Sequence, residues 1–274
     1  MIELRAGANV ARISSLSAAL TYLEIDAIVA IAPVTEAAIL NTFASVICAP
    51  WPNRIADGVW GEEKFPGNDV HGNALHGLVF DKKFGLTEQT DNSATYVYRL
   101  ASSKQYPFDL EIGATYLLNE FGIEVTYFAK NVGEGTAPYG VAAHPYFKVE
   151  NDSKFSIRAK QQSINDAKQI HIGLEPATKA GENLVFGDTK LDDCFTELTG
   201  DVVITHADGS TVTIWQDPAY KYLMVYTGHH LGGLAIEPQT CPANAFNTGE
   251  DLIWLAPGQS WQANWGVTAK GHHG

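Results

Sequence analysis

Two titratable side chains stand directly before prolines, each at the end of an apolar stretch. His144 precedes Pro145 in VAAHPYFKVEND, and Glu237 precedes Pro238 in LAIEPQTCP. Proline restricts the preceding residue to an extended backbone, so both side chains are held stiffly at the ends of expected strands. An imidazole and a carboxylate can exchange protons with a substrate near neutral pH. The pair indicates general acid–base chemistry, although the carboxylate could equally form a salt bridge or face solvent.

Arg54, an acidic pair and two further histidines lie in turn-rich stretches. Arg54 lies in PWPNRIADG, where the alternative is a structural ion pair, and Asp192 and Asp193 lie in LDDCF, where a solvated turn is the alternative. His71 and His76 lie in HGNALHG, whose Gly and Asn residues indicate a loop. Their spacing matches no standard zinc pair on a helix, so we predict no metal site.

The remaining histidine and cysteine patterns indicate neither a metal centre nor a nucleophile. His229 and His230 are adjacent, and neighbours on a strand point to opposite faces. Cys48, Cys194 and Cys241 lack CxxC spacing, which favours free thiols in a reducing compartment. The stretch TCPANAFN offers Cys241 no base. Sequences of the forms GxxxxGK[ST], GxGxxG and GxSxG are missing as well.

The charge of the chain narrows its partners. Its 274 residues include 31 acidic and 18 basic side chains, for a net charge of −13. That sign repels phosphate backbones and anionic lipids, so we expect neither nucleic acid nor a membrane surface as partner. No apolar run approaches the roughly 20 residues of a membrane helix, and the first residues lack the layout of a signal peptide. We therefore expect a cytoplasmic protein.

Period-2 alternation of apolar and polar residues predicts many strands. It is clear at 94–101, and again at 109–118 and 123–132, which we expect to form a hairpin. The stretch 202–215 has Asp-Gly between β-branched runs, a strong hairpin signal. Residues 35–48 are helical by composition. Because no linker or repeat divides the chain, we predict one all-β domain over 1–274, with two packed antiparallel sheets.

Five stretches, in order along the chain, resemble the aldose 1-epimerase family of galactose-mutarotase-like proteins. The resemblance spans most of the chain and implies an antiparallel β-supersandwich, in agreement with the strand pattern. The matching stretches are WPNRIADG (51–58), NALHGLV (73–79), HPYF (144–147), LDDCFT (191–196) and EPQTCPANAFN (237–247).

The resemblance implies catalytic roles for three residues. His144 would be the general acid that protonates the sugar ring oxygen. Glu237 would be the base that removes the proton of the C1 hydroxyl. His76 would orient the substrate near the ring oxygen.

The resemblance also implies residues that bind a monosaccharide. Arg54 and Asp192 would hold sugar hydroxyls, and Asp192 is selected over Asp193 because the family pattern is Asp, two residues, then Phe. Asn53 and Tyr146, which lie in the matching stretches, are expected to bind the substrate too.

The implied reaction converts one anomer of a free aldose into the other by opening the ring, rotating the aldehyde about C1–C2 and closing the ring again. It needs no covalent intermediate and no cofactor. The negative charges of Glu237 and Asp192, if near His144, would favour its imidazolium form. The expected pH–rate profile is a bell whose acid limb tracks Glu237 and whose alkaline limb tracks His144.

Several aromatic side chains could offer an apolar face to a sugar ring, although the protein core is the alternative place for each of them. They are Trp51, Trp60, Tyr146, Phe147 and Trp215.

One position departs from the family pattern. Many galactose mutarotases have a substrate-binding glutamine where this chain has Met224, in LMVYTG. The departure leaves open which aldose is used. Two alternatives to a free-aldose epimerase also remain open, a phosphosugar 1-epimerase and a non-catalytic sugar-binding domain, as does the oligomeric state.

Overall fold

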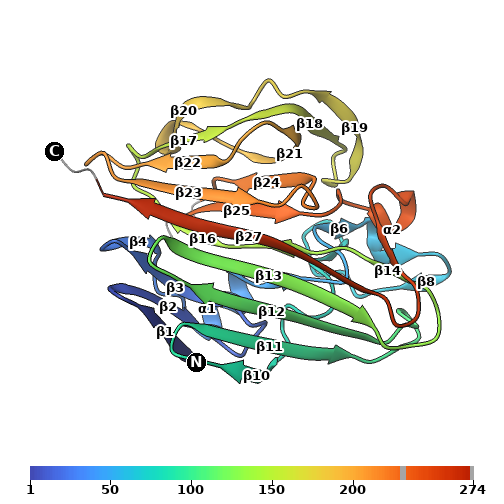
Figure 1. The fold of residues 1–274 in the computed structure, drawn as a ribbon. Helices are drawn as coiled ribbons and strands as arrows, with labels where there is room; N and C mark the ends of the chain where they lie inside the picture. Colours follow the sequence, from blue (N-terminus) through green and yellow to red (C-terminus); the bar gives the residue numbers. More distant parts are fainter. Residues whose placement is uncertain (229–232, 272–274) are drawn as a thin grey trace.

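Two large antiparallel sheets form the body of the protein in the computed structural model, which describes residues 1–228 and 233–271. The C-terminal strand β27 (Ser260–Lys270) lies in the middle of the nine-stranded sheet, between β13 and β23, and runs side by side with β13 in Figure 1. The order of this sheet is β10 (Gly85–Gln89), β11 (Ser93–Leu100), β12 (Leu110–Leu118), β13 (Gly122–Asn131), β27, β23 (Thr211–Gln216), β22 (Val202–Thr205), β17 (Lys154–Ile157) and β20 (Gly181–Val185).

The second large sheet has eight strands and contains most of the residues of interest. Strand β16 (Tyr146–Lys148) pairs with β25 beside the main path of this sheet. The main path is β19 (His171–Pro176), β18 (Ala159–Asn165), β21 (Asp192–Leu198), β24 (Tyr222–Tyr226), β25 (Gly233–Gln239), β15 (Ala142–Ala143) and β5 (Ile47–Cys48).

The smaller elements surround these sheets. A four-stranded sheet contains β1 (Ile2–Ala6), β2 (Asn9–Ile13), β3 (Leu20–Ile25) and β4 (Ile28–Ile31). Three strand pairs are β6 (Arg54–Ile55) with β9 (Ala74–Leu75), β7 (Val59–Trp60) with β8 (Glu63–Lys64), and β14 (Ala137–Tyr139) with β26 (Ile253–Leu255). The helical turns are α1 (Glu36–Thr42), α2 (Ala245–Thr248), η1 (Ala56–Gly58) and η2 (Phe186–Asp188). None of the helices in the described part of the chain is long and apolar enough to cross a membrane.

The core lies between the two large sheets. Strand β12 sends Ile112 and Tyr116 into it, and β25 sends Leu234 and Ile236 into it from the other side. The alternate residues of β25 point to the opposite face, because successive side chains on a strand alternate. That second face of β25 carries Glu237.

The sequence predictions of strands are confirmed. Strands β12 and β13 pair along their whole length, and the side chain of Asn119 accepts hydrogen bonds from the backbone N–H groups of Phe121 and Gly122 to close the turn. Strands β22 and β23 pair around the Asp208-Gly209 turn.

The expected helix over 35–48 is only partly correct. The side chain of Thr35 caps α1, but the helix ends at Thr42 because Phe43 adopts a left-handed backbone with φ 58°. Ile47 and Cys48 instead join the eight-stranded sheet as β5. Composition alone did not distinguish a helix from a buried edge strand.

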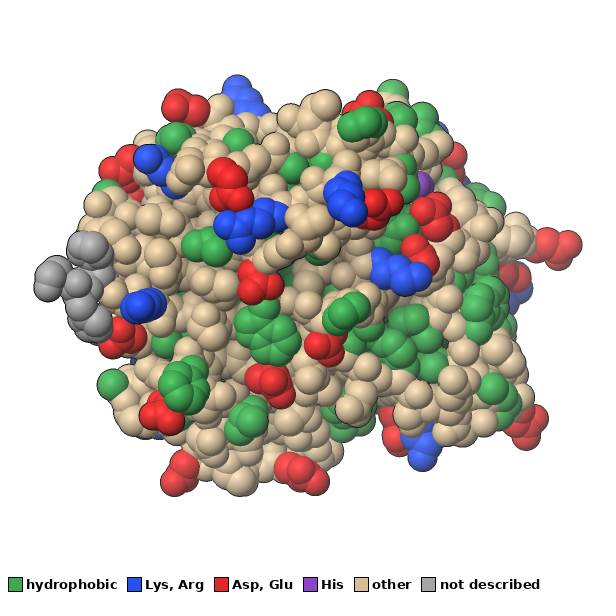
Figure 2. Space-filling view, turned by 45° about the horizontal axis from the view of Figure 1, so that its top comes forward, with side chains coloured by type: hydrophobic (Ala, Val, Ile, Leu, Met, Phe, Trp, Pro, Cys, Tyr) green, Lys and Arg blue, Asp and Glu red, His purple; other side chains and the backbone are tan. Residues whose placement is uncertain are grey.

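The surface agrees with the acidic composition. On the face shown in Figure 2, Lys and Arg side chains are scattered among acidic and apolar ones and do not gather into a patch.

Candidate active site

The strand register places His144 opposite Glu237. Ala142 in β15 pairs with Gln239 in β25, and Tyr146 in β16 pairs with Ala235. His144 lies between the two pairings, at the break where Pro145 cannot donate a ladder hydrogen bond. The Nε2 atom of His144 is 3.4 Å from Oε1 of Glu237. Both side chains are buried, at 7% and 3% exposure.

His76 reaches the same place from a loop. Its ring lies edge-on to His144, with the ring centroids 4.9 Å apart, and it also packs against the ring of Phe43 at 4.8 Å. The loop passes very close to the backbone of Ala49, because a Cβ on Gly77 would lie 2.1 Å from the carbonyl oxygen of Ala49. Only glycine allows this approach.

Three residues around these rings have left-handed backbones. The φ angles are 58° at Phe43, 52° at Asn53 and 63° at His76. Such angles are uncommon in residues other than glycine and cost of order 1–3 kcal/mol, so they persist only where the surrounding structure imposes them. These three positions therefore need the surrounding structure to hold their backbones in place.

The seven residues predicted as catalytic or substrate-binding line one cavity of about 240 Å³. The structure therefore brings together His76, His144, Glu237, Asn53, Arg54, Tyr146 and Asp192. The remaining lining residues are Asn41, Thr42, Phe43, Leu75, Met224 and Tyr226.

Arg54 and Asp192 bring opposite charges to this cavity. The Nε of Arg54 donates to Oδ2 of Asp69 at 2.9 Å, and its Nη1 donates to Oδ1 of Asn53 at 2.9 Å. Asp192 is water-accessible, yet the pocket walls partly desolvate it and raise its pKa, with Arg54 opposing the rise. Its neighbour Asp193 pairs with Lys179 at 2.5 Å and does not line the cavity.

Burial dominates the protonation of the central pair. It lowers the pKa of His144 to about 4. It raises the pKa of Glu237 well above the ordinary value, with Asp192 adding to the rise and Arg54 opposing it. The expectation that nearby carboxylates favour the imidazolium of His144 is therefore wrong for the empty site, because desolvation outweighs their attraction. Burial therefore favours the neutral imidazole of His144 and the protonated carboxyl group of Glu237.

The pKa of His76 is also lowered well below its ordinary value. Burial is the main cause, and the neighbouring His144 and Arg54 contribute. A neutral ring can donate one hydrogen bond and accept another, which suits a residue that orients hydroxyl groups.

Of the five aromatic residues considered for sugar contact, only Tyr146 lines the cavity. Its ring stacks beside that of His144, with centroids 5.4 Å apart. Trp51 and Phe147 are buried in the core. Trp60 packs against Phe65 and Phe246, and Trp215 lies in β23 of the other sheet.

The other titratable groups named from the sequence lie elsewhere. His71 is exposed, and His229 and His230 fall outside the described residues. Burial raises the pKa of all three cysteines, to about 12 at Cys194 and Cys241, so their thiols stay protonated. Within 1–228 and 233–271, no cluster of three or more His, Cys, Asp or Glu side chains could hold a metal ion.

The sequence analysis missed Asp69, which accepts a hydrogen bond from Arg54 and does not itself line the cavity. The signal was present in NDVHGN, where an aspartate followed by glycine and asparagine is typical of a turn closed by the aspartate side chain. Phe43 and Tyr226 were also missed, and both line the cavity.

Comparisons with known proteins agree with this architecture. The sequence profile described as aldose 1-epimerase matches residues 2–268. The uncharacterized protein YihR of Escherichia coli strain K12 is 31% identical over 238 residues, which cover 78% of this chain and 75% of YihR.

Solved structures share the fold. A galactose mutarotase-like protein from Clostridium acetobutylicum superimposes with a TM-score of 0.84 at 19% identity, over 98% of this chain and 95% of that one. Galactose 1-epimerase from Lactobacillus acidophilus superimposes with a TM-score of 0.82 at 17% identity, over 99% and 94% of the two chains. Identities this low establish the β-sandwich architecture alone. Together with the profile match over nearly its whole length, they lead to one conclusion: the chain belongs to the aldose 1-epimerase family.

Proposed function

We propose that the protein is an aldose 1-epimerase that interconverts the α and β anomers of a free monosaccharide. The observation that carries the proposal is the contact of 3.4 Å between His144 Nε2 and Glu237 Oε1, in the wall of a cavity whose polar lining suits sugar hydroxyls. An acid and a base that face the same small cavity can reach two oxygens of one bound sugar.

Ring opening requires two proton transfers. Glu237, as carboxylate, takes the proton of the C1 hydroxyl, and His144, as imidazolium, gives a proton to the ring oxygen. The C1–O5 bond breaks as the C1=O bond forms, so the sugar becomes a neutral open-chain aldehyde. Rotation about C1–C2 turns the other face of the carbonyl toward the C5 hydroxyl, and the reverse transfers close the ring as the other anomer.

The protonation of the empty site fits one stage of this cycle. Opening the ring converts an ion pair of His144 and Glu237 into a neutral imidazole and a protonated carboxyl group. Burial favours that same neutral form, as the raised pKa of Glu237 and the lowered pKa of His144 indicate. The site would thus stabilise the open-chain stage, which is the unfavourable stage for a free aldose. Because the pair holds one proton throughout, no exchange with solvent is needed.

The remaining lining groups would bind and orient the sugar. Arg54 and Asp192 offer a charged donor and a charged acceptor for hydroxyl groups, and charge-assisted hydrogen bonds of this kind are the stronger ones. His76 and Asn53 line the same cavity, and each has a backbone with positive φ.

A phosphorylated sugar is a less favourable substrate for this cavity. Arg54 is the one Lys or Arg side chain among its described lining residues, and Asp69 already neutralises it. Asp192 adds negative charge where a dianion would need several basic contacts.

NMR exchange spectroscopy between anomeric protons tests the proposal. We expect the protein to accelerate exchange in at least one aldose of a panel containing glucose, galactose, xylose and arabinose, and to act more weakly on glucose 6-phosphate. Unaccelerated exchange across all free aldoses would contradict the proposal. If only the phosphorylated sugar exchanged faster, the substrate class would be wrong while the reaction stood.

A further inference from the structure

The carboxylate of Asp69 is fully engaged by four hydrogen bonds. Its Oδ1 accepts from the backbone N–H of His71 at 2.9 Å and of Asn73 at 2.7 Å. Its Oδ2 accepts from Nδ2 of Asn73 and from Nε of Arg54, both at 2.9 Å. The side chain is only 5% exposed. An ionised carboxylate has about four acceptor positions, so Asp69 has none to offer a substrate.

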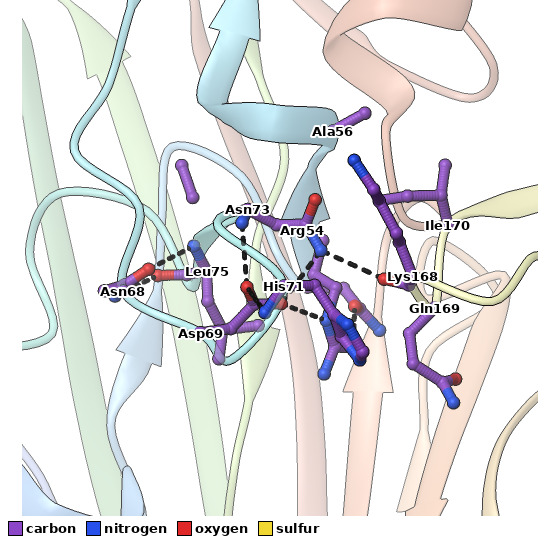
Figure 3. A network of polar contacts seen from close by, with 12 residues as sticks. Arg54, Ala56, Asn68, Asp69, His71, Asn73, Leu75, Lys168, Gln169 and Ile170 are labelled. Atoms are coloured by element: carbon purple, nitrogen blue, oxygen red, sulfur yellow. Dashed lines mark hydrogen bonds and ion pairs between the residues drawn. The ribbon is translucent and has the colours of Figure 1, made fainter.

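Asn73 fixes Asp69 to two other segments of the chain. Its Oδ1 accepts a hydrogen bond from the backbone N–H of Asp57 in η1. Its Nδ2 also donates to the carbonyl of Lys168 at 3.0 Å. Asn73 is completely buried. Figure 3 shows Asp69 between Arg54 and Asn73, and the contact from Asn73 to Lys168 in the turn between β18 and β19.

The guanidinium of Arg54 is therefore held at two atoms. Nε is bound by Asp69, and Nη1 is bound by Asn53, whose own side chain contacts the sulfur of Met224 at 4.0 Å. The Arg54 side chain is 16% exposed and lines the cavity. An unrestrained arginine side chain samples many rotamers. The two hydrogen bonds therefore restrict the Arg54 guanidinium to one orientation.

The charge of Asp69 agrees with a role in holding Arg54. Burial alone would raise the pKa of Asp69, but the hydrogen bonds from Asn73, Arg54 and His71 outweigh it and lower the pKa. Asp69 is thus a permanent anion at neutral pH. Its partner Arg54 is close enough to Glu237 and Asp192 to oppose the rise of both their pKa values.

We propose that Asp69 is a positioning residue for the epimerase reaction, which holds the guanidinium of Arg54 in the orientation that binds sugar hydroxyls beside Glu237. It acts through Arg54 and makes no contact with substrate itself. The proposal rests on the proposed function of this cavity, and it names a residue whose role lies entirely in orienting another.

The Asp69→Asn variant tests this directly. Displacement of a substrate-positioning group by about an ångström can cost roughly 100-fold in rate, so we expect kcat/KM to fall roughly 10- to 100-fold, with most of the loss in KM. The matched control is Asp57→Asn, which makes the same chemical change in the same network. The Asp57 carboxylate pairs with the amino group of Lys168 and does not touch Arg54, so kcat/KM should be unchanged.

A double-mutant cycle with Arg54→Gln separates positioning from general damage. If Asp69 acts through Arg54, then Asp69→Asn should cause no further loss in the Arg54→Gln background. Equal losses in both backgrounds would overturn the proposal, as would an Asp69→Asn variant that is as active as the parent.

A measurement on the parent protein covers the case in which Asp69→Asn does not fold. With ¹⁵N-labelled arginine, the Nε–H of Arg54 should exchange slowly with solvent, and its resonance should persist and shift on titration with galactose or glucose. Fast exchange in the sugar-bound protein would overturn the proposal. Binding is read here without turnover, so a parent that binds sugar but does not accelerate anomer exchange would reject the proposed function and still test Asp69.

Discussion

Glu237 and Met224 are direct cross-strand partners in β25 and β24, and both line the same cavity. Met224 is 6% exposed and packs with Cys194 and Tyr222 in a small apolar cluster. The wall of the cavity beside the carboxylate is therefore apolar at the position where many galactose mutarotases are expected to have a glutamine.

Replacing Met224 by Gln should change sugar preference. The new amide would add a donor and an acceptor beside Glu237, and one hydrogen bond is worth roughly 0.5–1.5 kcal/mol, so the ratio of kcat/KM for galactose to that for glucose should change about 2- to 10-fold. The empty variant should lose about 1–3 kcal/mol of stability, because a polar amide replaces the thioether that packs against Cys194 and Tyr222. Anomer exchange rates and urea unfolding measure the two effects. Met224→Leu, which keeps the wall apolar, is the control, and an equal change of preference in both variants would contradict the argument.

Removing either member of the central pair should abolish most of the activity. Each positioned proton transfer contributes roughly 10²- to 10⁴-fold, so Glu237→Gln and His144→Asn should each lower kcat by about that factor. The double variant should be little worse than either single one, since the two residues act as a unit. Polarimetry of freshly dissolved α-glucose or α-galactose gives the rates.

A second histidine–glutamate contact, between β19 and the turn that follows α2, provides the control. His171 Nε2 is 3.4 Å from Glu250 Oε2, a distance equal to that of the central pair, but neither residue lines the cavity. Glu250→Gln should keep its activity. If it lost as much as Glu237→Gln, the effect would come from damage to the sheet and not from proton transfer.

The pH profile should carry the shifted pKa values of the pair. Burial lowers the pKa of His144 to about 4 and raises the pKa of Glu237 well above its ordinary value, so we expect both groups to be neutral between these two limits. We expect kcat/KM to be level through neutral pH, to fall below about pH 4, and to fall again on the alkaline side. The acid limb then follows His144 and the alkaline limb Glu237, the reverse of the assignment expected from the sequence. An acid limb near pH 6.5 would show that burial does not control the imidazole.

Stability should also depend on Glu237. Its pKa is raised in the folded protein, so between about pH 4.5 and that raised value the folded protein holds a proton that the unfolded chain has released. The parent should therefore lose stability relative to Glu237→Gln as pH rises through this interval, by about 1.4 kcal/mol per pH unit. Urea unfolding at several pH values measures the difference. The exposed position Glu62 supplies the control, Glu62→Gln, for which the difference from the parent should stay constant; a constant difference for Glu237→Gln would refute the prediction.

The central pair could be predicted from local sequence patterns, whereas the other site residues were predicted only from the family resemblance. His144 and Glu237 could be selected because a proline follows each of them, a restriction visible in two letters. Arg54 and Asp192 depend on which loops the sheets bring together, which no local pattern encodes. Asp69 went unnoticed because its role exists only once the turn through Asn73 has closed.

The protonation of His144 was mispredicted for a related reason. The sequence indicates which charges are present, but not how little water remains around an imidazole. Only the packing of Phe43, His76 and Tyr146 around the ring reveals that desolvation outweighs the neighbouring carboxylates.

The cavity wall has two kinds of position for protein engineering. Phe43, Asn53 and His76 have left-handed backbones, and other positions lie on an extended strand. A β-branched side chain at any of the three would oppose the local conformation before it met a sugar. Met224 and Tyr226 instead lie on the extended strand β24, where a substitution does not have to adopt a left-handed backbone. Substitutions intended to change the proposed sugar preference are therefore best confined to that strand.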